Sequence, residues 1–267
     1  MCKVFHLNRS TIYKIINHNI SNQEINRLEL ESKIIDIYNG SKQIYGAPKI
    51  TKVLEKQGYH TSEKRISRYM KRLSIKSIVV KKYKPQSVSK APDDKENLMN
   101  QEFQTTAINQ KWVMDITYIP TVYDGWTYLA STEDLHAKII LGYCYSRHMK
   151  QEIVLESLRQ AAYRATETKG IMIQSDLGSQ YLSYEVEEFL KQNGMIHSYS
   201  RKGTPYDNAP MESFHSILKK ELVYRRVFKT FEEARVAIFE FIEGWYNRNR
   251  IHGSINYQTP YQVYYLK

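Results

Sequence analysis

The sequence contains few cysteines and no long apolar run. Cys2 and Cys144 are its only cysteines, which is too few for a disulfide framework or a cysteine-rich zinc site. No apolar run approaches the roughly 18 to 20 residues of a membrane helix, and residues 1–6 do not begin a secretory signal. These absences predict a protein that does not span a membrane and that works in a reducing cytoplasm.

Acidic residues are scarce relative to basic ones. The 267 residues include 39 lysines and arginines against 28 aspartates and glutamates, which gives a net charge of +11. A hydrophobic fraction of 42% and an aromatic fraction of 12% exclude a disordered, charge-dominated chain. The length suffices for one large domain or two smaller ones. The net charge indicates a polyanionic partner.

The excess positive charge lies entirely in the first third of the chain. Residues 1–90 hold 19 lysines and arginines against 6 acids, whereas residues 91–267 hold 20 against 22. A solvated basic surface would explain this imbalance, but so would a nucleic-acid-binding arm, since neutralised phosphates release counterions. A polar, proline-containing stretch predicts a linker at 81–104, between a basic module at 1–80 and a body at 105–267.

Three short helical patterns make up the basic module. The first starts at Asn8, the second starts near Tyr45 and ends at Gly58, and the third starts near Ser62. Two short helices joined by a glycine-bearing turn are typical of a helix-turn-helix, although a small bundle with exposed lysines is the alternative. The residues that we expect to contact DNA lie on the third helix: Lys64, Arg65, Arg68, Lys71 and Arg72.

The body begins with a β-branched and aromatic run at 111–119 that predicts a strand. Asp115 interrupts this run, and a carboxylate within an apolar strand is costly unless it is paired, hydrogen-bonded or bound to a metal. Further strands are expected at 126–131 and 139–145. An amphipathic helix follows the strand at 139–145, and Gly170 is expected to end it. Later in the chain we expect a helix at 184–192, a short strand at 196–200 and a last long helix that packs through Ala234, Phe241 and Trp245.

Two more acids follow at the ends of predicted elements. Asp176 follows a short buried strand at 171–173, at the kind of position where ligands collect in open mixed sheets. Glu212 starts a helix, where by itself it would only compensate the helix dipole. Together with Asp115, these acids are oxygen ligands of the type that Mg²⁺ or Mn²⁺ takes. Two such ions can activate an attacking oxygen and stabilise a leaving one in phosphodiester displacement.

Several short motifs occur in order along the chain, with 35 residues between Asp176 and Glu212. They lie at 45–50, 112–117, 174–181, 201–209, 212–221, 245–252 and 259–260. In this order they resemble the DDE transposases of bacterial insertion sequences, specifically the OrfB-type subunit with a retroviral-integrase-like catalytic core. One position departs from the family pattern: Gln174 stands where a His usually precedes Ser-Asp, and Gln does not titrate near neutral pH.

The resemblance implies an α/β fold, an RNase H-like mixed sheet flanked by helices, after a small all-α helix-turn-helix module. It implies a DNA transposase that performs Mg-dependent strand cleavage and strand transfer at insertion-sequence ends. Asp115, Asp176 and Glu212 would be the catalytic residues and would hold two Mg²⁺ (or Mn²⁺) ions. Lys219, two helical turns past Glu212, would meet the DNA phosphate beside them.

The resemblance also implies partners and a location. The partners are double-stranded DNA, as terminal inverted repeats and as target DNA, and further copies of the chain in a homo-oligomer on DNA. Because the chain starts close to its first helical pattern, we expect an upstream-frame helix-turn-helix partner protein or a fusion to one. The protein would act in the bacterial cytoplasm, in association with the nucleoid.

Other functions fit part of the sequence. A retroviral integrase would carry a His/Cys zinc module at its front, but residues 1–90 contain only Cys2 among cysteines. A nuclease for RNA–DNA hybrids would have little use for a basic helix-turn-helix. A DNA-binding repressor or accessory protein with an inactive core stays open, and it predicts tight DNA binding without Mg²⁺-dependent strand cleavage.

Three residues near these acids are interpreted as non-catalytic. Asp207 is expected to be a loop or cap residue rather than the third acid. Asp134 is expected to order the turn after the second strand. His215 is expected to face solvent rather than the metals.

Overall fold

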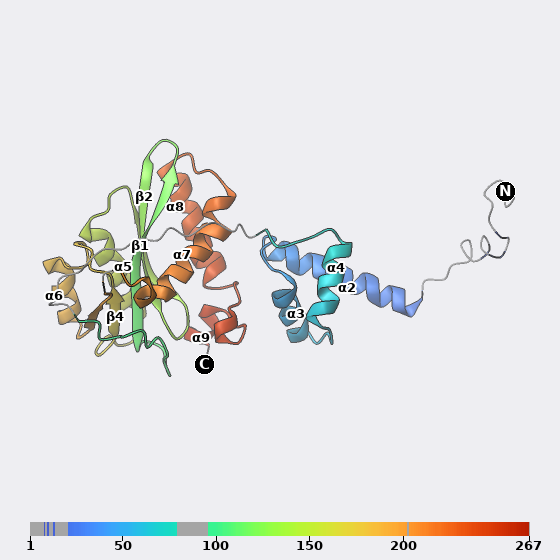
Figure 1. The fold of residues 1–267 in the computed structure, drawn as a ribbon, viewed down its shortest axis with the longest axis horizontal. Helices are drawn as coiled ribbons and strands as arrows, with labels where there is room; N and C mark the ends of the chain where they lie inside the picture. The colour runs from blue at the N-terminus through green and yellow to red at the C-terminus, as the bar shows by residue number, and fades with distance from the viewer. Residues whose placement is uncertain are drawn as a thin grey trace. The chain divides into compact units, whose positions relative to one another are not determined.

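The chain forms two compact units in a computed structural model, one ending at Ile78 and the other starting at Val79 (Figure 1). The described residues are 8, 10, 13, 21–78, 96–201 and 203–266. Most of the first predicted helix and most of the predicted linker lie outside them. Residues 96–103 of the predicted linker pack against the rest of the second unit: the Met99 amide donates to Ser198 Oγ at 2.9 Å, and Met99 is buried. The predicted domain boundaries stay a prediction.

The first unit packs three helices around a small apolar core. They are α2 (Asn22–Gly40), α3 (Ala47–Lys56) and α4 (Glu63–Arg72). Ser62 caps α4 by accepting a hydrogen bond from the Arg65 amide, and Gly58, with φ +86°, lies in the turn between α3 and α4. Ile34, Ile50 and Ile66 are fully buried between the helices. The second and third predicted helices are therefore confirmed.

Helix α2 was not predicted from the sequence. Its buried residues Leu30, Ile34 and Tyr38 repeat every four positions, as expected for one helix face. However, Ile25 and Leu28 are about half exposed and lie off this stripe. These exposed apolar residues blur the periodicity, so only packing against α3 and α4 identifies the buried face.

A five-stranded mixed sheet forms the centre of the second unit (Figure 1). In spatial order the strands are β3, β2, β1, β4 and β5. The β3–β2 and β2–β1 pairs are antiparallel, whereas the β1–β4 and β4–β5 pairs are parallel. The bounds are Lys111–Thr121 (β1), Gly125–Asp134 (β2), Ile140–Ser146 (β3), Met172–Ser175 (β4) and Ile196–Tyr199 (β5). All five strands were expected from the sequence.

Helices cover both sides of this sheet, with α5 and α6 on one side and α7 and α8 on the other (Figure 1). The bounds are Gln151–Arg164 (α5), Tyr184–Gln192 (α6), Ala209–Glu221 (α7) and Phe231–Phe239 (α8). On the first side, Trp112, Met114 and Ile116 of β1 join a buried cluster with residues of α5 and α6. Asp115, which alternates with them, is therefore directed away from that cluster.

Contact between α5 and β3 is unusually close. A Cβ atom at Gly142 would lie 1.9 Å from the carbonyl oxygen of Ser157, so no side chain fits there. The α5 helix ends at Arg164, and Ala165 is already extended. The expectation that Gly170 ends this helix was wrong: Gly170 lies in the following turn, with φ +81°.

Short elements complete the second unit. They are the 3₁₀ turns Pro205–Asn208 (η1), Val223–Arg225 (η2) and Gly253–Ile255 (η4), the π turn Glu240–Tyr246 (η3) and the helix Pro260–Tyr265 (α9). Ala234, Phe241 and Trp245 are buried, as predicted for the helix in this region. Within the described ranges, no helix is both long enough and apolar enough to cross a bilayer.

A buried carboxyl group in β2 predicts a pH dependence of stability. Burial raises the pKa of Glu133 to about 7 from an ordinary value of 4.5, although the charge of Lys138 lowers it. The folded chain thus binds this proton more tightly than the unfolded chain. The tighter binding of this proton contributes to stability in full below pH 4.5, and the contribution is lost as the pH rises through about 7. We expect Glu133→Gln to remove this loss.

Thermal denaturation of both proteins tests the prediction. The melting temperature of Glu133→Gln minus that of the wild type should rise between pH 4.5 and about 7. Two parallel curves would show that the pKa of Glu133 is the same in the folded and the unfolded chain.

Candidate active site

Asp115 and Asp176 lie at matching positions on adjacent parallel strands. In the β1–β4 pair, Val113 is opposite Gln174. Asp115 is two residues past Val113, and Asp176 is two residues past Gln174, directly after β4 ends. Neighbouring strands are roughly 4.8 Å apart, so this register brings the two carboxylates close together where β4 ends beside β1.

The two carboxylates influence each other's ionisation. Burial raises the pKa of Asp176, the hydrogen bond from the Gly178 amide to Asp176 Oδ1 at 2.9 Å lowers it, and the negative charge of Asp115 raises it again. Asp115 Oδ1 accepts a hydrogen bond from the Ile116 amide at 2.8 Å, and its side chain is 25% exposed. A nearby divalent cation would relieve the repulsion between these charges.

Helix α7 lies against the same part of β1. His215 Nδ1 is 3.5 Å from Asp115 Oδ2, and the Asn208 side-chain amide donates to the carbonyl oxygen of Met114 at 3.3 Å. His215 is buried, so the expectation that it faces solvent was wrong. Its position three residues after Glu212, on the same helix face, was the signal that could have identified it.

Lys219 also lies within electrostatic range of the acid pair. Burial lowers the pKa of its ammonium group, and the negative charge of Asp115 opposes that shift. Lys219 is one helical turn past His215, and both residues are on the side of α7 that approaches Asp115. Its contact with DNA phosphate stays a prediction.

Glu212 is exposed in the first turn of α7. It lies one turn before His215, on the side of the helix that approaches Asp115. In the part of the chain that the structure describes, no three His, Cys, Asp or Glu side chains are arranged around one metal position. The structure thus brings Asp115 and Asp176 together but does not bring Glu212 to them, and a shared metal site stays a prediction.

Two buried polar atoms near Asp115 have no hydrogen-bond partner among the described residues: His215 Nε2 and Asn208 Oδ1. Burial raises the pKa of Tyr181, and the negative charges of Asp115 and Asp176 raise it further. Buried polar groups normally find partners, so these atoms indicate a site completed by a ligand. Two neighbouring carboxylates and these polar groups fit a hard divalent cation with its water.

The loop before α7 is held by a different acid. Asp207 is buried and accepts hydrogen bonds from Asn97, Gln101 and Arg201 at 2.7–3.1 Å. Burial would raise its pKa, but the hydrogen bonds from Arg201 and Gln101 outweigh burial and lower it. Asp207 is therefore the structural loop residue that was expected. Gln174 donates to Ser200 Oγ at 2.9 Å and so also supports this loop.

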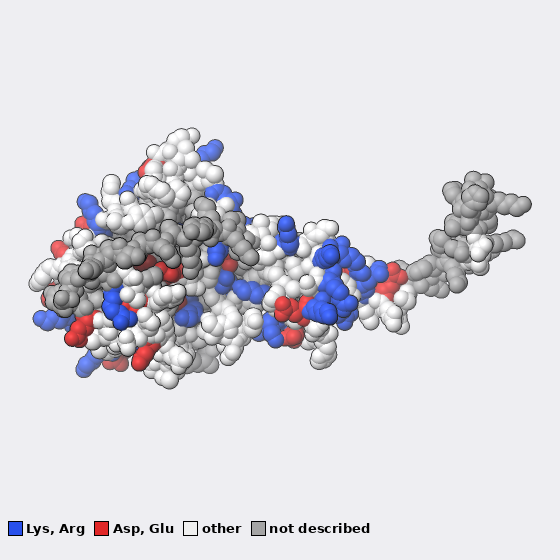
Figure 2. Space-filling view, in the orientation of Figure 1, with Lys and Arg blue, Asp and Glu red and all other residues white. Residues whose placement is uncertain are grey.

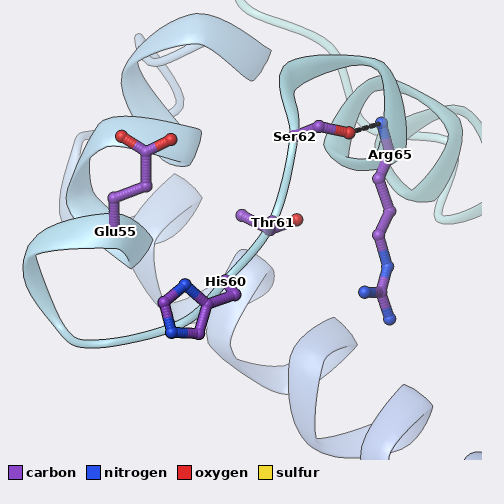
Figure 3. A pocket seen from close by; sticks show the side chains of 5 residues that line it. All are labelled: Glu55, His60, Thr61, Ser62 and Arg65. Atoms are coloured by element: carbon purple, nitrogen blue, oxygen red, sulfur yellow. Dashed lines mark hydrogen bonds between the residues drawn. The ribbon is translucent and has the colours of Figure 1, made fainter.

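The basic face of α4 is the second candidate site. Lys64, Arg65, Arg68, Lys71 and Arg72 are all exposed. Figure 2 shows lysine and arginine side chains gathered over the region of this helix. Arg72 also contacts Glu31 of α2. A pocket between the end of α3 and the start of α4 is lined by Glu55, His60, Thr61, Ser62 and Arg65 (Figure 3).

Similarity to known proteins extends over nearly the whole chain. The transposase for insertion sequence element IS904 of Lactococcus lactis is 39% identical over 241 residues, which cover 90% of this chain and 95% of that protein. The transposase InsF for insertion sequence IS3A of Escherichia coli is 33% identical over 265 residues, 98% of this chain and 92% of that protein. The chain belongs to the insertion-sequence transposase family.

Family models match both units of this transposase. Two integrase core domain models match residues 105–205 and 193–260, and an HTH-like domain matches residues 24–83, which include α3, α4 and all of α2 except its first two residues. A chain of a simian T-cell lymphotropic virus intasome, solved with PP2A regulatory subunit B56 gamma, has a similar fold. Its TM-score is 0.50 at 13% identity, over 88% of this chain and 75% of that chain. The predicted fold class is confirmed.

Proposed function

We propose that this transposase cleaves and joins DNA strands at the ends of its insertion sequence, with Asp115, Asp176 and Glu212 as ligands of two divalent ions, Mg²⁺ or Mn²⁺. The observation that carries the proposal is the in-register placement of Asp115 and Asp176 on β1 and β4. Glu212 is one helical turn from His215, which contacts Asp115, so a change in its side-chain rotamer would direct it toward the pair.

The metal ions, when bound, would supply activation of the attacking oxygen and stabilisation of the leaving oxygen in phosphodiester displacement. Asp115 would be the central one of the three metal-binding acids, since it lies between Asp176 and α7. Lys219 would bind the phosphate next to the acids, because its half-buried ammonium group is close enough to Asp115 for the two charges to interact. No protein nucleophile is needed: the residues position DNA, and a water or a 3′-hydroxyl attacks in line.

The basic face of α4 would provide most of the DNA affinity. Neutralising phosphates releases counterions, so binding by Lys64, Arg65, Arg68, Lys71 and Arg72 should weaken steeply with salt. Joining two element ends to one target requires both ends to be held together. We therefore also propose a homo-oligomer on DNA, with the helix-turn-helix partner or fusion as the reader of the terminal repeats.

A strand-transfer assay tests the function. The full chain would be incubated with a labelled duplex taken from the DNA that flanks its gene, together with a supercoiled plasmid. We expect joined products with Mg²⁺ or Mn²⁺, none after addition of EDTA, and recovery when excess metal is returned.

Two results would contradict the proposal. Tight DNA binding without any metal-dependent joining would identify a repressor or accessory protein with an inactive core. Cleavage of an RNA–DNA hybrid in preference to element-end DNA would identify an RNase H-type nuclease.

A further inference from the structure

A row of hydrogen-bonded side chains connects α6 and β5 to the end of β4. Ser175 Oγ is 2.8 Å from His197 Nε2, and His197 Nδ1 is 3.2 Å from Glu187 Oε1. The Tyr199 hydroxyl also donates to Glu187 Oε1. Ser175 is 0% exposed, and the side chain of His197 is 6% exposed. We call Ser175, His197 and Glu187 the support triad.

The same three residue types can activate a nucleophilic serine, but a nucleophile must reach its substrate. Ser175 is the last residue of β4 and is fully buried. It lies on the same face of the strand as Ile173, which belongs to the buried cluster shared with α5 and α6. The support triad therefore has no access to a substrate, and its role depends on what Ser175 holds in place.

The single hydroxyl proton of Ser175 is directed at the next residue. Ser175 Oγ donates to the carbonyl oxygen of Asp176 at 2.9 Å. Since that proton is used, His197 Nε2 must donate to Ser175 Oγ. On the other side of the ring, Nδ1 faces a carboxylate oxygen of Glu187, which accepts. His197 thus donates in both directions and holds Ser175 with its proton toward Asp176.

Asp176 depends on such a contact because it lies just beyond the sheet. The β4–β5 ladder ends at Ser175, whose carbonyl oxygen accepts the Ser200 amide at 2.7 Å. Past this point, Ser175 Oγ holds the Asp176 carbonyl oxygen, and the Gly178 amide holds the Asp176 carboxylate. Fixing the carbonyl fixes the backbone that leads to Gly178, and with it the direction of the carboxylate beside Asp115.

We propose that Ser175, His197 and Glu187 are positioning residues for Asp176, and that they set the affinity of the acid pair for its divalent ions. Their influence passes through the backbone, since the triad lies on the α5 and α6 side of the sheet and Asp115 is directed to the other side. Partners behind a metal ligand typically change metal affinity by roughly 10- to 100-fold. The inference rests on the proposed function, which makes Asp176 a metal ligand.

Binding of Mn²⁺ to the full chain, without DNA, provides the test. The electron paramagnetic resonance signal of free Mn²⁺ is lost on binding, so a titration followed by this signal gives the affinity. Asp176→Asn should remove the binding. Ser175→Ala leaves the carboxylate in place but removes its support, and it should weaken Mn²⁺ binding roughly 10-fold, the lower end of that range, because Ser175 contacts the backbone of Asp176.

Two replacements of His197 separate positioning from a purely structural role. A Gln side chain can place its amide nitrogen near the position of Nε2, whereas Asn can place its nitrogen near that of Nδ1. His197→Gln should keep the contact with Ser175 and most of the Mn²⁺ affinity. His197→Asn should keep only the contact with Glu187 and weaken Mn²⁺ binding roughly 10-fold. The reverse order would overturn the proposal, because it would show that His197 only ties β5 to α6.

Ser157→Ala is the matched control, because Ser157 is also a buried serine, 1% exposed, that contacts both a side chain and a backbone carbonyl. Its Oγ is 2.8 Å from Thr132 Oγ1 and donates to the Gly142 carbonyl oxygen at 3.1 Å. This variant should lower the melting temperature about as much as Ser175→Ala and keep the wild-type Mn²⁺ affinity. Unchanged affinity in Ser175→Ala, or an equal loss in Ser157→Ala, would overturn the proposal.

The titration also separates this inference from the function on which it rests. Asp176-dependent Mn²⁺ binding that is unchanged in Ser175→Ala would contradict the positioning role alone. Binding that weakens in Ser175→Ala, in a wild-type chain that joins no DNA, would contradict the strand-transfer activity alone. Absence of Mn²⁺ binding in the wild type, or binding that persists in Asp176→Asn, would contradict both, since the triad would then have no metal ligand to position.

Discussion

Asp115→Asn is expected to lower the rate of strand transfer by about three orders of magnitude or more. Loss of a metal ligand removes several kcal/mol of transition-state stabilisation, and each ~1.4 kcal/mol corresponds to a factor of ten. Asp176→Asn and Glu212→Gln should have the same effect if the three acids share one site. Duplex binding should persist in all three variants, because α4 provides most of it.

The substitutions that abolish strand transfer should leave the stability of the fold unchanged or raise it. Burial already raises the pKa of Asp176, and the charge of Asp115 adds to that shift, so the folded state carries a cost for ionising both. Asp115→Asn or Asp176→Asn removes this repulsion and should leave the melting temperature unchanged or raise it. Glu212→Gln should leave it unchanged, because Glu212 is exposed.

Glu232→Gln provides the control for charge loss alone. Glu232 is exposed on α8, in a surface ion pair with Arg235, and its replacement should leave strand transfer at the wild-type rate. Normal strand transfer in Asp115→Asn, Asp176→Asn or Glu212→Gln would remove that residue from the catalytic site. A large fall in melting temperature would instead show that the residue holds the fold.

Arg250→Ala is expected to destabilise the second unit by about 3–5 kcal/mol, the typical cost of leaving a buried charge without its partner. Glu221, at the end of α7, is 4% exposed and accepts hydrogen bonds from Arg250 Nε at 3.0 Å and Nη2 at 2.8 Å. The Trp245 indole donates to the same carboxylate at 3.1 Å. Removing Arg250 leaves this carboxylate in the interior with one neutral donor.

Arg235→Ala is the matched control, because its ion pair with Glu232 has a similar length, 2.7 Å, but both side chains are more than half exposed. Surface pairs contribute about 0–1 kcal/mol, so chemical denaturation should separate the two variants clearly. Replacing both Glu221 and Arg250 by Leu and Met should recover much of the loss. Equal effects of Arg250→Ala and Arg235→Ala would show that burial does not govern this pair.

The Glu221–Arg250 pair also matters for the candidate active site. Glu221 is two residues past Lys219 on α7, and the pair ties this end of the helix to the segment after η3. Partial loss of the pair should therefore loosen the contact of His215 with Asp115. This link was not visible in the sequence, where Glu221 was only part of a family motif.

Local patterns predicted most of the elements. Short apolar runs, β-branched and aromatic in the first, predicted the five strands, and turn and cap residues predicted the ends of α3 and α4, because those signals depend on neighbours within a few residues. The missed helix α2 and the wrongly predicted end of α5 also have local causes. Helix α2 carries exposed apolar residues that blur its stripe, and α5 ends before its glycine because Ala165 is extended.

The sequence by itself determined the basic segment and the order of strands and helices, since charge and periodicity are properties of the chain, whereas the shared role of the three acids stays a prediction. Only the tertiary structure decided that Val113 pairs with Gln174, so that Asp115 and Asp176 end side by side. It also decided that His215 is buried against Asp115 and that Trp126 stays in solvent. Such placements depend on pairing and packing between segments distant in the sequence, which no local pattern encodes.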